Sequence, residues 1–184
     1  MANYNVTITN GQGSESMKAG TYNVSAISAP GYDLTSLSPT TFTASKAAGS
    51  GSFTLSASGT LTLVFNETGA EGGTPITSGS VVMTNQAGTE EYGEPITIDS
   101  TGNAVFQNVA YGDSQTPFML YFKQLSSDES HNIESGIISV SMTSASQTEY
   151  VLNSPIAEQT ISLMDANYSG LTIPSATLSF EEEA

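Results

Sequence analysis

The sequence predicts an all-β protein: two small β-sandwich domains in tandem, followed by a C-terminal strand segment. Apolar and polar residues alternate with a period of two in most segments, which is typical of half-buried strands. The 17 Gly and 7 Pro residues separate these segments, and strands recur about every 8–12 residues, the spacing expected of an all-β sandwich. No segment keeps a 3.6-residue period for more than about two turns, so we expect little helix.

The first predicted domain comprises residues 1–65. Tyr4, Val6 and Ile8 alternate with polar residues and indicate a half-buried strand. A second alternating strand, at 21–27, is broken by residues 29–32, where Pro lacks an N–H and Gly tolerates a positive φ. The further strands of this domain are predicted around Phe42, at 53–57 and at 60–65.

The second predicted domain comprises residues 66–155. It opens with a turn cluster at 66–73, and residues 99–103 form a turn with Gly102 at its tip. Residues 126–134 are polar and acidic and are predicted to be an exposed loop. Strands are predicted at 80–84, 95–98, 104–107, 117–123, 137–142 and 149–153.

The third predicted part, residues 156–184, is a strand segment with an acidic tail at 181–184. Its short strands, at 159–164, 171–173 and 176–180, have no obvious partners in the preceding domain. A first domain of about 60 residues has a marginal core, so it is expected to need strands from elsewhere. We predict a subunit contact by strand addition, or a fold-back onto the same chain, through Leu171, Ile173, Leu178 and Phe180.

The charge of the chain excludes several classes of partner. There are 18 Asp and Glu residues against 3 Lys or Arg, a formal net charge of −15. Nucleic-acid binding needs basic residues that displace counterions from phosphates, and an anionic membrane surface also attracts basic residues. We therefore expect no nucleic-acid partner, no membrane insertion and an acidic exterior that keeps the protein soluble.

The absence of Cys excludes disulfides, thiolate metal sites and a Cys nucleophile. No apolar run approaches the roughly 18–20 residues of a membrane span. No basic segment followed by an apolar one comes after Met1, so we expect a product made without a signal peptide, although a trimmed chain with an added Met is the alternative.

Short stretches of both predicted domains resemble a known family. Residues 73–84 (GTPITSGSVVMT), 98–112 (IDSTGNAVFQNVAYG) and 118–122 (FMLYF) are similar to the prealbumin-like, collagen-adhesin B-type (SpaA-like) domains of Gram-positive pilins, adhesins and phage surface proteins. In the first domain, residues 19–24 (AGTYNV) and 29–32 (APGY) resemble the second half of the same pattern. The resemblance covers about half of the chain and implies Ig-like or prealbumin-like sandwiches.

The resemblance also implies an intramolecular isopeptide bond between a Lys on the first strand and an Asn or Asp on the last, assisted by a buried acid. Asn153 lies near the acceptor position. The donor is missing, because neither 60–65 nor 4–9 contains Lys, Lys18 lies in a loop and Lys123 falls where the family often has its acid. We therefore expect no such bond.

No catalytic constellation is recognisable, and we predict that the protein is not an enzyme. His131 has no partner at motif spacing and is predicted to be a solvated loop residue. Glu90 and Glu91 are adjacent, as are the glutamates of 181–183, and adjacent carboxylates do not suit a glycosidase cleft. These groups are interpreted as solvated charge.

No cofactor is expected. Calcium is the most credible metal, because only oxygen ligands are abundant. Residues 99–103 and 165–170 carry alternating oxygen donors but lack the terminal Glu of an EF-hand loop. Hairpin and Asx turns explain both segments with fewer assumptions.

The sequence therefore predicts a non-enzymatic structural protein. We expect a subunit of a virion surface (a phage head fibre or decoration protein) or of an extracellular fibre. Its expected partners are its own copies and other virion or fibre proteins. The alternative is an adhesin module, extracellular or on the bacterial cell surface, that recognises host glycan or protein through Tyr32, Tyr92 and Tyr111. These tyrosines lie in turns, and Tyr is enriched at interfaces.

Overall fold

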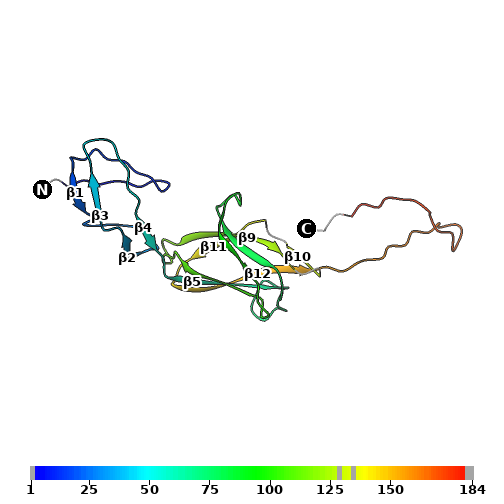
Figure 1. The fold of residues 1–184 in the computed structure, drawn as a ribbon. Helices are drawn as coiled ribbons and strands as arrows, with labels where there is room; N and C mark the ends of the chain where they lie inside the picture. The colour runs from blue at the N-terminus through cyan, green and yellow to red at the C-terminus, as the bar shows by residue number, and fades with distance from the viewer. Residues whose placement is uncertain (1–2, 128–129, 134–135, 181–184) are drawn as a thin grey trace.

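The computed structural model describes residues 3–127, 130–133 and 136–180, which form twelve strands and no helix (Figure 1). The predicted all-β class is confirmed. The predicted acidic tail, 181–184, lies outside the described residues. The strands are β1 (Gly20–Asn23), β2 (Asp33–Ser38), β3 (Thr41–Ala44), β4 (Thr54–Ser56), β5 (Gly59–Asn66), β6 (Ser80–Thr84), β7 (Glu91–Thr97), β8 (Asn103–Val109), β9 (Phe118–Ser126), β10 (His131–Ile133), β11 (Ile138–Met142) and β12 (Ser146–Pro155).

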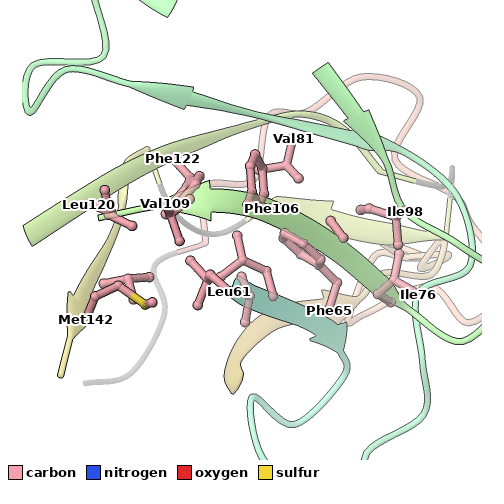
Figure 2. Packing of buried hydrophobic residues seen from close by; sticks show 14 residues of the cluster. Leu61, Phe65, Ile76, Val81, Ile98, Phe106, Val109, Leu120, Phe122 and Met142 are labelled. Atoms are coloured by element: carbon pink, nitrogen blue, oxygen red, sulfur yellow. The ribbon is translucent and has the colours of Figure 1, made fainter. Parts of the chain in front are cut away.

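A β-sandwich forms the middle of the chain. One sheet has the order β10-β12-β5-β8 and the other has the order β11-β9-β6-β7. The alternation at 60–65 works as predicted, because Leu61, Leu63 and Phe65 are fully buried between the sheets. The rings of Phe106 on β8 and Phe122 on β9 meet across the core with centroids 4.6 Å apart (Figure 2).

The pairing of the first strand of the sandwich, β5, with the last, β12, determines where the chain enters and leaves the sandwich. β12 pairs with β5 in parallel, with Thr60 opposite Ser146 and Asn66 opposite Leu152. The chain therefore enters at the start of β5 and leaves at the end of β12, at the opposite end of the sandwich. Eight strand residues span roughly 26 Å at about 3.3 Å per residue. Figure 1 shows the N-terminal strands and the C-terminal segment extending from these two ends.

The boundary expected after residue 65 falls inside a strand. β5 bonds to β8 and β12, so we propose that the sandwich comprises residues 59–155 and that residues 3–57 form a separate N-terminal unit. Alternation within 60–65 marks a strand but does not say to which sheet it belongs.

The N-terminal unit contains two antiparallel strand pairs, β1 with β3 and β2 with β4, and no side chain of residues 3–56 is buried. Two ring contacts hold it together, Tyr4 with Tyr22 at 5.5 Å and Phe42 with Phe53 at 6.4 Å. Isolated two-stranded ribbons are marginally stable in water, so this unit lacks a core of its own.

The strand predicted at 4–9 is not formed. Its only ladder contact is an isolated bridge between Thr9 and Gln12, although its alternating pattern is as clear as that of β5. The alternation of apolar and polar residues shows which side chains of a strand would share a face. It does not provide the neighbouring strand, which must come from elsewhere in the fold.

Candidate functional site

The strongest candidate for a functional surface is the chain beyond β12, residues 156–180, which we call the C-terminal arm. It runs away from the sandwich and contains one hairpin-like turn (Figure 1). Met164 and Thr172 form an isolated bridge, and Leu171 O accepts a hydrogen bond from Asp165 N at 2.9 Å. Ile173 N also donates to Leu163 O at 3.2 Å, so the predicted strands 159–164 and 171–173 meet in this turn. The strand predicted at 176–180 is unpaired within the described residues.

The arm exposes its apolar side chains. The four predicted contact residues are 54% (Leu171), 40% (Ile173), 49% (Leu178) and 75% (Phe180) exposed. The other large apolar residues of the arm are exposed as well: Ile156, Ile161, Leu163, Met164 and Tyr168. An apolar surface of this kind on an extended strand is typical of an interaction site.

The structure brings three of the four predicted contact residues together. Ile173, Leu178 and Phe180 line one shallow depression, and Leu171 lies outside it. Ile161 and Leu163 line the same depression but were not predicted as contacts. Their spacing of two residues was the available signal, because it places both side chains on one face of an extended chain.

Two of the predicted loop tyrosines meet at the junction of the N-terminal unit and the sandwich. Tyr32 and Tyr111 line one hollow with Gly31, Asp33 and Ser58. Tyr111 N donates a hydrogen bond to Gly31 O at 3.4 Å. The ring of Tyr32 meets that of Phe118 on β9 edge-on, with centroids 6.0 Å apart. Both tyrosines therefore pack the junction as well as facing solvent.

Tyr92 lies apart from this pair, on edge strand β7 and not in the turn that was predicted for it. Its hydroxyl donates a hydrogen bond to a Glu90 carboxylate oxygen at 3.2 Å. Desolvation, and then the neighbouring carboxylate, raise the pKa of Tyr92 above its ordinary value. The structure thus does not gather the three predicted tyrosines into one surface.

The prediction for His131 is wrong. It lies on β10, which pairs with the end of β12 inside the segment expected to be a loop. His131 Nε2 is 2.9 Å from Glu67 Oε1, and the imidazole is only 12% exposed. The polar composition of 126–134 concealed this strand, because three residues are too few to show a period.

A buried amide pair occupies the place where the resemblance implied a covalent bond. Asn153 on β12 and Gln124 on β9 exchange two hydrogen bonds, from Gln124 Nε2 to Asn153 Oδ1 at 2.8 Å and from Asn153 Nδ2 to Gln124 Oε1 at 3.0 Å. Both residues are buried. The pair joins the two sheets without a Lys donor.

Removing one partner of this amide pair is expected to destabilise the sandwich. Asn153→Leu leaves the Gln124 amide buried without its partner, which costs about 1–3 kcal/mol. Adding Gln124→Met is expected to restore part of the loss, because the Gln124 amide is then no longer buried without Asn153. Urea unfolding of both single variants and the double variant gives the coupling energy; additive losses would contradict the assigned pairing.

The two segments considered for calcium are turns stabilised by their own backbone. Asp99 Oδ1 accepts hydrogen bonds from Thr101 N at 2.7 Å and Asn103 N at 3.0 Å, and Gly102 has φ +83°. Asp165 Oδ1 accepts from Asn167 N and Tyr168 N. No group of three His, Asp or Glu side chains in the described parts of the chain is placed to hold a metal ion.

The Asp99 turn is expected to make stability depend on pH. The Thr101 hydroxyl, followed by the backbone N–H groups, lowers the pKa of Asp99 below its ordinary value of 3.8. The stabilisation of the folded state by the ionised Asp99 carboxylate is therefore present above pH 3.8 and is lost as the pH falls through the lower pKa of the folded state. Asp99→Asn is expected to lower the urea midpoint at pH 7 and to approach the wild type in acid. Glu71→Gln, in an exposed loop, is the matched control; a gap that stays constant with pH would contradict the assignment.

No protein-family model and no curated protein sequence matches the chain. Among solved structures, the chain is similar to GBS52, the minor pilin of the Gram-positive pathogen Streptococcus agalactiae, with a TM-score of 0.46 and 12% identity over 56% of this chain and 47% of the pilin. It is also similar to the Bacillus anthracis TIE protein, with a TM-score of 0.40 and 12% identity over 67% of this chain and 22% of that one.

A third similar structure is BcpA, the major pilin subunit of Bacillus cereus, with a TM-score of 0.37 and 13% identity over 55% of this chain and 32% of that one. The chain spans less than half the length of each of the three proteins. Two of them are pilins. The described residues also contain no helix long and apolar enough to cross a membrane.

Proposed function

We propose that the protein is a non-enzymatic structural subunit that assembles with copies of itself into a fibre or a surface layer. The observation that carries this proposal is the C-terminal arm. It presents alternating apolar side chains on extended backbone, and no sheet in the described ranges of the chain receives them. An exposed strand of this kind gains hydrogen bonds and apolar burial when it joins the sheet of a neighbour.

The surface suits such an assembly. Charged residues are only 11% of the chain, so Ser, Thr, Asn and Gln carry much of the exterior, while the net charge of −15 opposes non-specific association. We propose a virion surface, as a phage head fibre or decoration protein, with an extracellular fibre on a bacterial cell as the alternative setting. Electron microscopy of the source particles with a labelled antibody distinguishes the two settings.

An adhesin module is the second candidate function. The observation in its favour is the hollow in which Tyr32 and Tyr111 lie beside Asp33 and Ser58, because tyrosine rings and polar side chains together can bind a glycan. Binding to a host-glycan array that is lost in Tyr111→Ser and kept in Tyr92→Ser would favour this function. Tyr92 is the matched control because it lies outside the hollow.

The molar mass of the full chain in solution tests the proposed function. Light scattering across a concentration series is expected to give masses that rise through multiples of one chain. A mass of one chain at every concentration would contradict self-assembly and would leave the adhesin module as the better account.

A further inference from the structure

Residues 4–8, which we call the N-terminal segment, have the sequence of a strand and lack a partner strand. Val6 and Ile8 are 43% and 62% exposed. A Cβ atom built on Gly13 would lie 2.9 Å from both Val6 Cγ1 and Ile8 Cδ1. Both side chains therefore lie over Gly13 and share one face. The ring of Tyr4 packs edge-on against that of Tyr22. Within the described chain, the backbone of 4–8 forms no hydrogen bond with other backbone groups.

Residues 176–180, which we call the arm strand, have the matching properties. Ala176, Leu178 and Phe180 are spaced by two, which places them on one face of an extended chain, and all three line the depression described above. Within the described part of the arm, the backbone hydrogen bonds end at Ile173, whose N–H donates to Leu163 O at 3.2 Å. Each of the two segments therefore offers three apolar positions at strand spacing and an unpaired backbone edge.

The topology separates these two segments. Because β5 and β12 are parallel, the N-terminal unit and the arm leave the sandwich at opposite ends. The arm lies on the side of the sandwich away from the N-terminal unit, where it turns and runs back toward the sandwich (Figure 1). A neighbouring copy placed end to end brings its N-terminal segment to the arm without any rearrangement of the sandwich.

The charge distribution favours the same pairing. Residues 59–155 contain eleven Asp and Glu against one Lys, and residues 156–184 contain five acidic residues and no basic one. Residues 3–57 contain two Lys and two acidic residues, so the N-terminal unit is neutral. The acidic residues of 156–184 are therefore repelled less by this neutral unit than by the acidic sandwich.

We propose that the arm strand of one copy pairs with the N-terminal segment of the next copy, so that Ala176, Leu178 and Phe180 cover the exposed side of Val6 and Ile8. This inference rests on the proposed function and names the acceptor within the partner. The added strand supplies apolar cover that the N-terminal unit lacks within its own chain. Since each copy has one donor and one acceptor at opposite ends, the contact is heterologous and propagates head to tail.

Disulfide trapping between two variants tests this pairing, and the Cys-free chain makes the result unambiguous. One variant carries Leu178→Cys in the arm and the other carries Val6→Cys in the N-terminal segment. After mixing and mild oxidation, most of both chains are expected to shift to a covalent species of twice the mass. The control acceptor is Val105→Cys, an exposed apolar position on the outer side of β8.

The outcomes separate the two proposals. Trapping of the arm variant by Val105→Cys in preference to Val6→Cys would overturn the acceptor and leave self-assembly intact. A chain carrying both Leu178→Cys and Val6→Cys that closes on itself at high dilution would overturn pairing between copies. Absence of trapping at every position, together with a molar mass of one chain, would overturn the proposed function as well.

Discussion

Replacing Leu178 and Phe180 by Asp is expected to reduce the protein to a monomer under conditions in which the wild type assembles. Both side chains are exposed in the single chain, so the substitutions leave the fold of the subunit unchanged. In the assembly they would place carboxylates in an apolar contact, and burying a charge without a partner costs several kcal/mol. Light scattering of the purified variant measures this loss.

The matched control adds the same charge to the other face of the same strand. Thr177 and Ser179 alternate with the apolar positions, so Thr177→Asp together with Ser179→Asp keeps the apolar face intact. This variant is expected to assemble as the wild type does. Equal loss of assembly in both double variants would show that charge alone, and not the apolar face, controls the association.

Truncating Phe65 to Ala is expected to destabilise the sandwich by about 3–5 kcal/mol, which is typical of a buried aromatic residue. Phe65 is fully buried on β5, a strand that has neighbours on both sides. The cavity would open where the two sheets meet (Figure 2). Urea unfolding monitored by circular dichroism measures the change in the free energy of unfolding.

Val105→Ala is the comparison for this variant, because Val105 lies on neighbouring β8 but is 39% exposed. It is expected to change the free energy of unfolding by less than about 0.5 kcal/mol, as surface substitutions do. Similar losses for the two variants would contradict the inside and outside faces assigned to this sheet.

The sandwich strands were largely readable from the sequence, because one face of each is covered. Leu61, Leu63 and Phe65 alternate with half-buried residues on β5, and the turn at Asp99 has its Gly at a positive φ. β10 was not readable: His131 and Glu67 are 64 positions apart, and only the fold brings them within hydrogen-bond distance.

Which strands pair with one another could not be predicted from the sequence pattern. The alternation of Tyr4, Val6 and Ile8 predicts a strand as well as that of β5 does, yet only β5 has neighbours. The parallel pairing of β5 with β12 joins segments about 86 residues apart in the register, Thr60 with Ser146, and local pattern carries no information on such distant contacts. The meeting of Tyr32 with Tyr111 depends on the same long-range arrangement.

A complementation experiment tests the head-to-tail account most directly. One variant, Leu178→Asp with Phe180→Asp, loses its donor strand, and a second, Val6→Asp with Ile8→Asp, loses its acceptor. Each is expected to be a monomer alone, while an equimolar mixture is expected to form a dimer of one copy of each and nothing larger, because a single intact contact remains. Sedimentation velocity that shows only monomers in the mixture would contradict the account.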